Sequence, residues 1–491
     1  MHIGDLMIES GVSFGTSGAR GLATAMTDWV CYAYTAGFLS YLRASAQITQ
    51  GQIVGLAGDL RPSSPRILTA CAAAVHDLGY QPHNFGAIPS PALAAFGIAQ
   101  RIPTLMITGS HIPDDRNGIK FNLPTGEILK PDEEGIRQQR VTLPPNHFDA
   151  TGQFFSDQRQ HLPAPDARAY RDYVERYLAF FPPNCLAGQR IGVYEHSSVA
   201  REAFAAVLAG LGAQVTRLGY SAQFLPVDTE AIRPEDVVLA RDWAASGKFD
   251  ALVSADGDGD RPLLSDEFGN WLRGDVLGIL CARQLGARGV VTPISSNTAL
   301  EKCGEFAAIT RTRIGSPFVI AGMNALIQQG IAPVVGYEAN GGFLLGTALE
   351  HDGRCLAALP TRDAVIVAVT VLLAAVAQGK PISALAADLP QRFTHSDRLK
   401  NIPTERSQAQ LAALNSGDFE QDQAAIAQQF GAQFGAAVAV DTTDGLRITF
   451  ANGEIAHLRP SGNAPELRVY TEADSAARAA EMNQLCLESM R

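Results

Sequence analysis

The sequence predicts an α/β fold in which three similar mixed-sheet domains precede a smaller α+β C-terminal domain. The first observation is length, because 491 residues exceed what one hydrophobic core accommodates and suggest three or four domains. The second is that strand-like and helix-like segments alternate, and that this alternation restarts twice. The third is a final segment with closely spaced strand signals. We therefore expect domains at residues 1–150, 165–268, 269–385 and 396–491.

The first domain is indicated by two helix-like segments and two short apolar strands. Residues 28–44 and 67–78 have the spacing of apolar side chains expected of helices. Residues 52–57 and 104–108 are apolar runs typical of buried strands, and the second leads directly to Ser110. This alternation indicates helices layered on a largely parallel sheet. Functional groups then tend to lie on loops at the carboxyl ends of the strands.

The alternation resumes in the second and third domains, whereas the fourth domain differs from them. Looser, turn-rich stretches separate the domains at residues 149–166, 265–274 and 379–404. Predicted strands occupy residues 189–194, 251–254, 289–293 and 333–336. Predicted helices occupy residues 199–211, 276–285 and 317–328. In the last domain a helix at 408–413 and strands at 437–440 and 446–450 indicate a small α+β fold.

Composition and charge exclude several classes of protein. An apolar content of 46% and a charged content of 18% are typical of a globular protein in water. The net charge of −11 argues against a nucleic-acid-binding surface. The most apolar run, residues 364–377, is too short to cross a bilayer and predicts a buried helix. Seven scattered cysteines without a CxxC pair favour reduced thiols. We expect a cytoplasmic protein that binds neither nucleic acid nor membrane.

The first candidate catalytic loop follows the predicted strand at 104–108 and reads TGSHIPDDRNGIK. A serine between a strand end and a polar turn can be exposed and still be held by a rigid scaffold. Phosphoryl transfer requires an oxygen nucleophile, a nearby base and cations that neutralise developing charge. Ser110 is the candidate nucleophile, and His111 and Lys120 are candidate helpers. Taken alone, the motif is equally compatible with an ordinary polar turn.

The second candidate loop is DGDGDR, residues 256–261, which follows the apolar strand at 251–254. Its carboxylates, Asp256, Asp258 and Asp260, are separated by glycines and can converge on one hard cation. Oxygen ligands of this kind suit Mg²⁺ or Ca²⁺. The closing glutamate of an EF-hand is missing. The loop therefore predicts a metal site, with an acidic surface turn as the alternative.

Three further glycine-containing loops carry groups suited to a phosphorylated sugar. In GYEANGG, Glu338 and Asn340 can hydrogen-bond to vicinal hydroxyls, although a structural glycine turn is the alternative. In FGTSGARG, Arg20 is a candidate cation for a phosphoryl group in transit. In RPSGNAPELR, which also reads as a hairpin, arginine, hydroxyl, amide and backbone N–H groups suit a phosphate. The candidates there are Arg459, Ser461, Gly462, Asn463 and Arg468.

Taken in order, these motifs resemble those of the α-D-phosphohexomutase superfamily along the whole chain. The motifs are FGTSGARG, TGSHIPDDRNGIKF, DGDGDR, GYEANGG and RPSGNAPELRVY. The segments GDLRPSS and IPSP, at 58–64 and 88–91, also look like features of the family's first domain. In that family the four later motifs are the phosphoserine, metal, sugar and phosphate loops. One comes from each of four domains around a central cleft, and the resemblance implies the same architecture here.

The resemblance also implies a reaction and a role for each loop. Ser110 would be phosphorylated in the active enzyme, and its phosphate would bind Mg²⁺ together with the three aspartates. The phosphoserine would donate to O1 or O6 of a hexose monophosphate, and a hexose 1,6-bisphosphate would return its other phosphate. Arg20 and Lys120 would stabilise or shuttle charge, and Arg261 would lie beside the metal loop. Glu338 and Asn340 would hold the sugar hydroxyls, and the RPSGNAPELR loop would hold the phosphate that is not transferred.

The sequence departs from the usual family pattern at positions that concern substrate preference. Ile112 stands where asparagine is usual, Asn340 replaces serine, and Asn463 with Ala464 replaces Thr-Glu. The serine loop is most similar to bacterial phosphomannomutase-type members, so we expect conversion of mannose 6-phosphate to mannose 1-phosphate by a monomer or homodimer. A phosphoglucomutase or phosphoglucosamine mutase is the alternative within the family. Outside it, the alternatives are a metal-dependent sugar phosphatase and a sugar-phosphate sensor without turnover.

Overall fold

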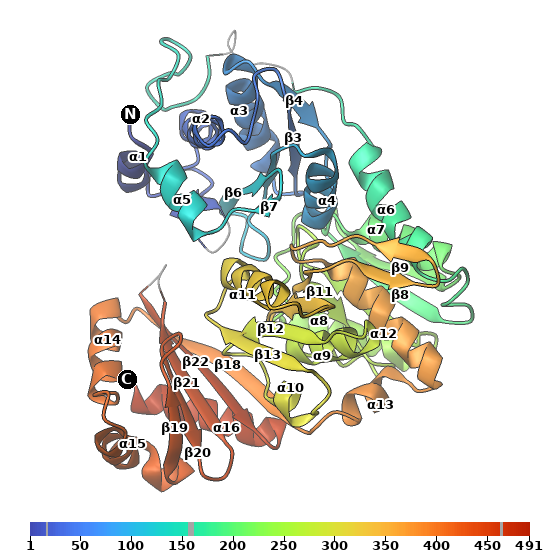
Figure 1. Cartoon of the computed structure of the whole chain (residues 1–491), viewed down its shortest axis with the longest axis vertical. Helices are drawn as coiled ribbons and strands as arrows, with labels where there is room; N and C mark the ends of the chain where they lie inside the picture. The colour runs from blue at the N-terminus through green and yellow to red at the C-terminus, as the bar shows by residue number, and fades with distance from the viewer. Residues whose placement is uncertain (16–17, 156–161, 462–464) are drawn as a thin grey trace. The chain divides into compact units, whose positions relative to one another are not determined.

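The computed structural model of the chain describes residues 1–15, 18–155, 162–461 and 465–491 (Figure 1). These residues form two compact units. The first unit consists of Met1–Val290 and Gly315–Leu385, and the second of Val291–Ile314 and Ala386–Arg491. The expected mixed α/β fold class is confirmed, whereas the four domain boundaries remain a prediction.

The first sheet of the first unit has seven strands in the order β1-β2-β6-β5-β3-β4, with β7 paired to β6. Their bounds are β1 Ser13–Phe14, β2 Ala19–Leu22, β3 Ile53–Gly58, β4 Gln81–Asn84, β5 Thr104–Ile107, β6 Arg116–Leu123 and β7 Gly126–Glu127. Only β3 pairs in parallel, with β4 and β5, and the other pairs are antiparallel. The expectation of a largely parallel sheet is therefore wrong for this domain. A loop of eight residues, 108–115, joins β5 to β6, and it is too short for a parallel crossover.

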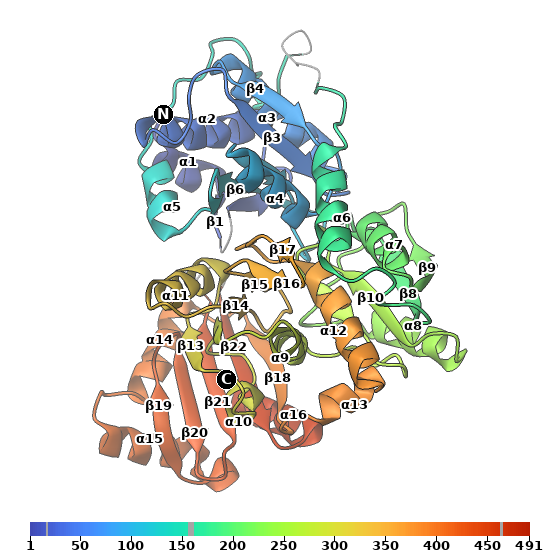
Figure 2. The same ribbon diagram turned by 45° about the vertical axis from the view of Figure 1, so that its right-hand side comes forward.

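Helices cover both faces of this sheet. They are α1 Ile3–Ser10, α2 Asp28–Ala44, α3 Ser64–Asp77, α4 Ser90–Gln100 and α5 Lys130–Arg137. The bounds of α2 match the prediction, and its start is fixed by Thr27, whose side chain accepts a hydrogen bond from the backbone N–H of Val30. The ribbons show α2 and α3 on one side of the sheet and α4 on the other (Figures 1 and 2). The main core lies between α2, α3 and the sheet.

The second sheet of the first unit has the order β11-β10-β8-β9. Its strands are β8 Arg190–His196, β9 Gln214–Tyr220, β10 Ala251–Ala255 and β11 Pro262–Leu264. The helices of this part of the chain are α6 Arg168–Phe180, α7 Arg201–Gly210 and α8 Pro234–Ala245. β8 pairs in parallel with β9 and β10, and β11 returns antiparallel to β10. The DGDGDR loop is the connection of this last hairpin, so the fully buried β10 fixes its position.

The remainder of the first unit contains short strands and several helices. The strands are β14 Val334–Tyr337, β15 Phe343–Leu345, β16 Leu349–His351 and β17 Arg354–Leu356, of which β14 pairs antiparallel with β15 and β16 with β17. The helices are α9 Gly274–Gln284, α11 Ser316–Gln328, α12 Ala364–Gln378 and α13 Ile382–Ala387. The apolar run at 364–377 forms α12, which is almost entirely buried, as predicted. None of the helices in the described parts of the chain has the length and apolar character needed to span a membrane.

The second unit is built around a five-stranded antiparallel sheet in the order β18-β22-β21-β20-β19. The strands are β18 Phe393–Lys400, β19 Ala437–Asp441, β20 Leu446–Phe450, β21 Ile455–Pro460 and β22 Glu466–Ala473, and the helices are α14 Thr404–Ala413, α15 Phe419–Phe434 and α16 Ala476–Ser489. This unit also contains α10 Ala299–Lys302, β13 Ala308–Thr312 and the end of β12 Gly289–Pro293. The stretch 379–404, expected to be loose, contains α13 and β18. β18 has little apolar alternation and is held by its pairing with β22.

Candidate active site

Ser110 lies at the end of β5, on a segment that we call the serine loop (residues 108–116), and its hydroxyl is aimed at a carboxylate. Its Oγ donates a hydrogen bond to Oδ2 of Asp256 at 2.5 Å and lies 3.3 Å from Nδ1 of His111. The backbone of Ser110 has a φ of 57°, in the left-handed region that non-glycine residues rarely adopt. The local chain is therefore bent to point this side chain at the aspartates.

The expectation of an exposed serine is wrong, because Ser110 is only 1% exposed. The side chain is enclosed by Asp256 and His111, which contact its hydroxyl. Ideal placement of a Cβ at Gly257 would put it 2.8 Å from the Ser110 carbonyl, so the DGDGDR loop also packs closely against the serine loop.

The three carboxylates of residues 256–261, the aspartate loop, converge as the sequence predicts. Asp256, Asp258 and Asp260 are at most 1% exposed, and each offers an oxygen within 4.8 Å of those of the others. Among the described residues this is the only such group of three metal-ligating side chains. Oδ1 of Asp258 and Oδ1 of Asp260 are buried without a hydrogen-bond partner in the described parts of the chain. Orphaned buried carboxylate oxygens of this kind fit a hard divalent cation such as Mg²⁺.

Positive side chains compensate the carboxylates. Nζ of Lys120 lies 2.6 Å from Asp258 and 2.5 Å from Asp260, and Nε of Arg362 donates to Asp260 at 3.0 Å. Although burial acts in the opposite direction, Arg362 and Lys120 lower the pKa of Asp260, which stays ionised. Burial together with Asp258 and Asp260 raises the pKa of Asp256 well above its usual value. Repulsion among the carboxylates is therefore felt most at Asp256, whereas Asp260 is compensated by the cations.

His111 lies beside the serine hydroxyl, and two arginines belong to the same group of charges. Nη1 of Arg261 donates to Nδ1 of His111 at 2.8 Å. Burial and the charge of Arg261 lower the pKa of His111 to about 3, so the imidazole is neutral near pH 7. Burial and Arg261 also lower the pKa of Arg20 to about 10, and this side chain remains cationic. Because Arg261 can only donate, Nδ1 of His111 is an acceptor and carries no proton.

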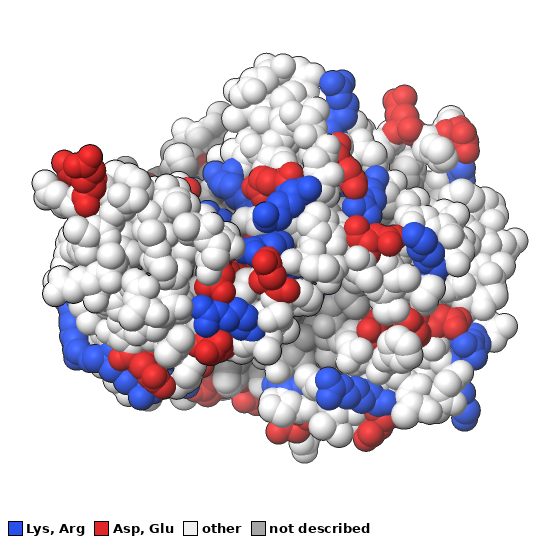
Figure 3. Space-filling model, turned by 90° about the horizontal axis from the view of Figure 1, so that it is seen from below, with Lys and Arg blue, Asp and Glu red and all other residues white. Residues whose placement is uncertain are grey.

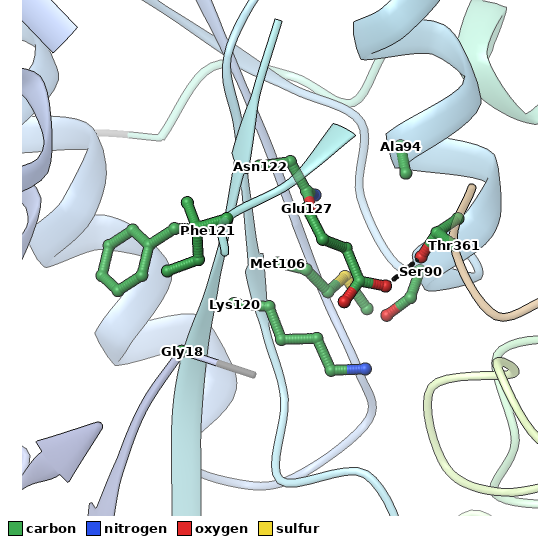
Figure 4. Close-up of a pocket in the computed structure, with 10 residues that line it drawn as sticks. Gly18, Ser90, Ala94, Met106, Lys120, Phe121, Asn122, Glu127 and Thr361 are labelled. Carbon is green, nitrogen blue, oxygen red and sulfur yellow. Dashed lines mark hydrogen bonds between the residues drawn. The ribbon is translucent and has the colours of Figure 1, made fainter. Parts of the chain in front are cut away.

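Figure 4 shows that Lys120 points into a small cavity on the α4 side of the first sheet, while the neighbouring Phe121 points away. The cavity measures about 10 Å³, which is the space of roughly one water molecule. Glu127 from β7 also reaches into it. Its carboxylate accepts hydrogen bonds from Thr361 and, at 2.9 Å, from Ser316 at the start of α11. Glu127 thereby ties the first sheet to the segment that carries Arg362.

The sugar-loop candidates lie on the hairpin between β14 and β15. Glu338 is 3% exposed and accepts a hydrogen bond from Nη1 of Arg362 at 3.2 Å. Oδ1 of Asn340 accepts from the backbone N–H of Gly342 at 3.0 Å, which fixes the turn. Arg362 therefore joins the sugar-loop candidate Glu338 to Asp260 of the aspartate loop.

The phosphate-loop candidates belong to the second unit. Arg459 on β21 and Arg468 on β22 are partners in the strand register, so two guanidinium groups start from adjacent positions. Nε of Arg459 lies 2.9 Å from Oδ2 of Asp444, and Ser461 is buried. Gly462 and Asn463 lie outside the described residues.

Two residues of the cluster in the first unit have no role in the sequence-based prediction. Arg362 lies between β17 and α12, just before the helix N-cap Asp363, and it is 2% exposed. Ser90, at the start of α4, donates to Oδ2 of Asp258 at 2.5 Å. Neither stands in a glycine-rich loop, and the contacts arise only when segments more than 100 residues apart in sequence meet. The segment IPSP, which contains Ser90, was the one available signal.

Surface charge adds little to the definition of the site. On the face of the molecule in Figure 3, acidic and basic side chains are interspersed, and its described residues form no continuous basic surface. The concentrated charge is instead buried, where the three aspartates meet Lys120 and Arg362, with the partly buried Arg261 beside them.

The chain is similar to known sugar-phosphate mutases along nearly its whole length. It matches the family description "Phosphoglucomutase/phosphomannomutase" in alpha/beta/alpha domain I over residues 11–142, in domain III over 273–393 and in the C-terminal domain over 399–488. It is 43% identical over 487 residues to a phosphomannomutase of Salmonella muenchen, covering 99% of this chain and 97% of that protein. It is also 43% identical over 464 residues to a phosphomannomutase of Sinorhizobium fredii, covering 94% and 95%.

More distant relatives carry other names. A phosphoglucosamine mutase of Magnetococcus marinus is 29% identical, over 94% of this chain and 88% of that protein. A phosphoglucomutase/phosphomannomutase family protein of Burkholderia thailandensis has a TM-score of 0.71 at 19% identity, covering 97% of this chain and 96% of that one. A phosphoglucomutase of Paramecium has a TM-score of 0.69 at 16% identity, covering 97% and 94%. These two structures bear on the fold alone.

Proposed function

Because the chain belongs to the phosphoglucomutase/phosphomannomutase family, we propose that it is a phosphomannomutase that interconverts mannose 6-phosphate and mannose 1-phosphate. The observation that supports this reaction most directly is the contact of 2.5 Å between the Ser110 hydroxyl and Asp256, inside a cluster of buried carboxylates and cations. The 43% identity to two phosphomannomutases favours mannose over the other hexoses. We further propose that the enzyme is cytoplasmic and acts as a monomer or homodimer.

In the proposed reaction Ser110 carries the phosphoryl group that is exchanged. The phosphoserine donates this group to the free hydroxyl of a hexose monophosphate, which gives a hexose 1,6-bisphosphate. The intermediate then returns its other phosphoryl group to Ser110. Lys120, Arg20 and Arg261 stabilise the negative charge on the transferring group: Lys120 contacts Asp258 and Asp260, Arg261 contacts His111, and Arg20 lies among the same charges. The Ser110 hydroxyl contacts Asp256 at 2.5 Å, so a carboxylate lies within hydrogen-bond distance of the oxygen that exchanges its proton for the phosphoryl group.

Asp256, Asp258 and Asp260, together with the phosphate on Ser110, would hold Mg²⁺. When bound, this ion supplies positive charge that polarises the phosphoryl oxygens. The orphaned oxygens of Asp258 and Asp260 support this assignment. Lys120 donates hydrogen bonds to the same two aspartates, so its ammonium group balances their charge. The same ammonium group would also be able to contact the phosphoryl group.

We propose that Glu338 and Asn340 bind the hydroxyl groups of the sugar. The phosphate that is not transferred would be bound by the RPSGNAPELR loop of the second unit. The residues proposed for that phosphate are Arg459, Ser461, Gly462, Asn463 and Arg468. One phosphate-binding site can hold the sugar in both orientations, because it binds a phosphate that is present before and after the transfer.

The substrate assignment is tested by measuring kcat/KM for mannose 1-phosphate, glucose 1-phosphate and glucosamine 1-phosphate on the same preparation. We expect mannose 1-phosphate to be converted at least about 10-fold more efficiently than glucosamine 1-phosphate, because specificity is the ratio of these values. A preference for glucose or glucosamine phosphate would replace the mannose assignment within the family. Release of free phosphate as the main product would identify a phosphatase instead.

The metal assignment is tested with Asp258→Asn. This change keeps the shape of the side chain but removes a negative ligand, so the half-saturating Mg²⁺ concentration should rise by about 10-fold or more and kcat should fall. The measurement is a Mg²⁺ titration of turnover. Asp266→Asn is the matched control, since Asp266 is also buried and caps its own turn outside the cluster. An unchanged titration for Asp258→Asn would remove this residue from the ligand set.

A further inference from the structure

Arg61, on the loop between β3 and α3, is completely buried against the serine loop. Its side chain has no exposed surface, and it pairs with Asp59, which is also buried. A guanidinium group offers five N–H donors in a rigid planar fork. Such a side chain is costly to bury unless its donors are satisfied. The groups that accept these hydrogen bonds therefore indicate the role of Arg61.

All five donors are used, and four of them hold the serine loop. Nε donates to Oδ2 of Asp59 at 3.0 Å. The other four donate to backbone carbonyls of this loop, at distances of 2.5 to 3.0 Å. The accepting carbonyls are those of Ser110, Ile112, Pro113 and Arg116. One side chain thus spans the whole bend from the end of β5 to the start of β6.

Asp59 also holds the serine loop through hydrogen bonds. It accepts a hydrogen bond from the Thr108 hydroxyl at 2.7 Å, and Oγ1 of Thr108 in turn accepts from the backbone N–H of Ser110 at 2.7 Å. The N–H and the carbonyl of Ser110 are therefore both tied to the Asp59–Arg61 pair. This pair can hold Ser110 at its unfavourable φ of 57°.

The surroundings of Arg61 are shaped to admit its guanidinium. A Cβ at Gly109 would lie 2.6 Å from Cζ of Arg61, so only glycine leaves room there. The guanidinium carbon lies 4.2 Å from the centre of the Phe224 ring, a cation–π contact. Phe224 also packs near Gly257 of the aspartate loop. The contact thus couples the serine loop to the part of the chain that presents Asp256.

We propose that Arg61 is a positioning residue for the Ser110 nucleophile. It fixes the backbone of the serine loop through four carbonyls, one of them that of Ser110, and thereby aims Oγ at Asp256. This inference rests on the proposed phosphoryl transfer through Ser110 and adds a residue that acts on the rate of that step. Arg61 touches neither sugar nor metal in this role, so its loss should lower kcat and leave KM for the hexose phosphate nearly unchanged.

The test compares Arg61→Lys with Arg66→Lys. Lysine keeps the charge at position 61 but cannot reproduce the fork, and a displacement of about 1 Å can cost about 100-fold in rate. We expect kcat to fall by about 100-fold, with KM within about threefold of the wild-type value. Phosphorylation of Ser110 by a hexose 1,6-bisphosphate, followed by intact mass, should slow by a similar factor. Arg66 is the control because it binds Asp28 and the carbonyls of Ala23 and Met26, away from the serine loop.

Each outcome separates a positioning role from a structural one. If both variants lose kcat equally, in proportion to their losses of thermal stability, the proposal is overturned. A normal kcat in folded Arg61→Lys would overturn it as well. If Arg61→Lys does not fold, the Phe224→Leu variant tests the proposal instead. Loss of the aromatic ring should lower kcat by about 3- to 10-fold at unchanged KM. An unchanged kcat in this variant would contradict the proposal. The wild type in the same assay tests the proposed function separately, because absence of its turnover would refute the mutase and not the role of Arg61.

Discussion

Replacing Ser110 by alanine is expected to lower mutase turnover by about 10⁴-fold or more. The change removes the only atom that can carry the phosphoryl group in the proposed reaction, and cation and metal contacts cannot replace a missing nucleophile. The fold should survive, because the lost contact is one hydrogen bond to Asp256, which costs about 1–3 kcal/mol. Turnover of mannose 1-phosphate and the intact mass of the protein, before and after incubation with hexose 1,6-bisphosphate, measure both consequences.

Ser90→Ala is the matched control for this experiment. Ser90 is buried in the same cluster and donates to Asp258 at 2.5 Å, as Ser110 donates to Asp256. Its loss removes an equivalent hydrogen bond without removing the nucleophile. We expect the Ser90 variant to keep measurable turnover and to gain one phosphate on Ser110. Substantial turnover in the Ser110 variant would overturn the assignment of the nucleophile.

The chemistry of the serine and aspartate loops could be predicted from sequence because each loop is local. Asp256, Asp258 and Asp260 lie within five residues of one another and follow a buried strand, so backbone geometry alone brings them together. The serine lies directly after β5 for the same reason. Their mutual contact, between positions 146 residues apart, required the family resemblance as well.

What could not be predicted depends on side chains that fill space between segments. Arg362 is a single arginine in a sequence without a distinctive pattern, and the GDLRPSS segment that contains Arg61 does not indicate what this side chain contacts. Apart from Asp59, two positions from Arg61, the partners of the two arginines lie 49 to 55 and 24 to 102 residues away. The burial of Ser110 was missed for the same reason, since polar loop residues are usually exposed. Of the cations that compensate the carboxylates, Lys120 and Arg261 stand in the recognisable motifs, whereas Arg362 comes from a segment outside them.

The fold was predictable to a similar extent. α2 and α12 are long and begin at side chains that cap them, Thr27 and Asp363, so pattern and capping agree. β6 was missed because its sequence, RNGIKFNL, is polar at its start and was read as part of a catalytic motif. Its position in the sheet comes from antiparallel pairing on both sides, with β5 and β2. Tertiary pairing therefore decides this strand, and local propensity does not.

Replacing Arg362 by methionine should produce the largest loss of stability among the variants considered. Arg362 is 2% exposed and compensates two buried carboxylates, with contacts of 3.0 Å to Asp260 and 3.2 Å to Glu338. Methionine keeps much of the volume but leaves these charges without their partner. Breaking a buried pair in this way costs about 3–5 kcal/mol. Burial lowers the pKa of Arg362, but the neighbouring carboxylates, Asp260 first among them, raise it well above its usual value. Arg362 is therefore charged at any ordinary pH, and the loss of stability in the variant should not depend on pH between about 6 and 9.

The measurement is urea unfolding followed by tryptophan fluorescence, because all three tryptophans of the chain lie in the first unit, which also contains Arg362. Arg354→Met is the control: its pair with Asp352 is exposed, at 3.4 Å, and such pairs contribute about 0–1 kcal/mol. Mg²⁺ should restore part of the stability lost in Arg362→Met, since the ion can compensate Asp260 in place of the guanidinium. Equal losses in the two variants would show that Arg362 does not balance the cluster. A loss in Arg362→Met that Mg²⁺ leaves unchanged would separate the arginine from the metal site and place its main role at Glu338.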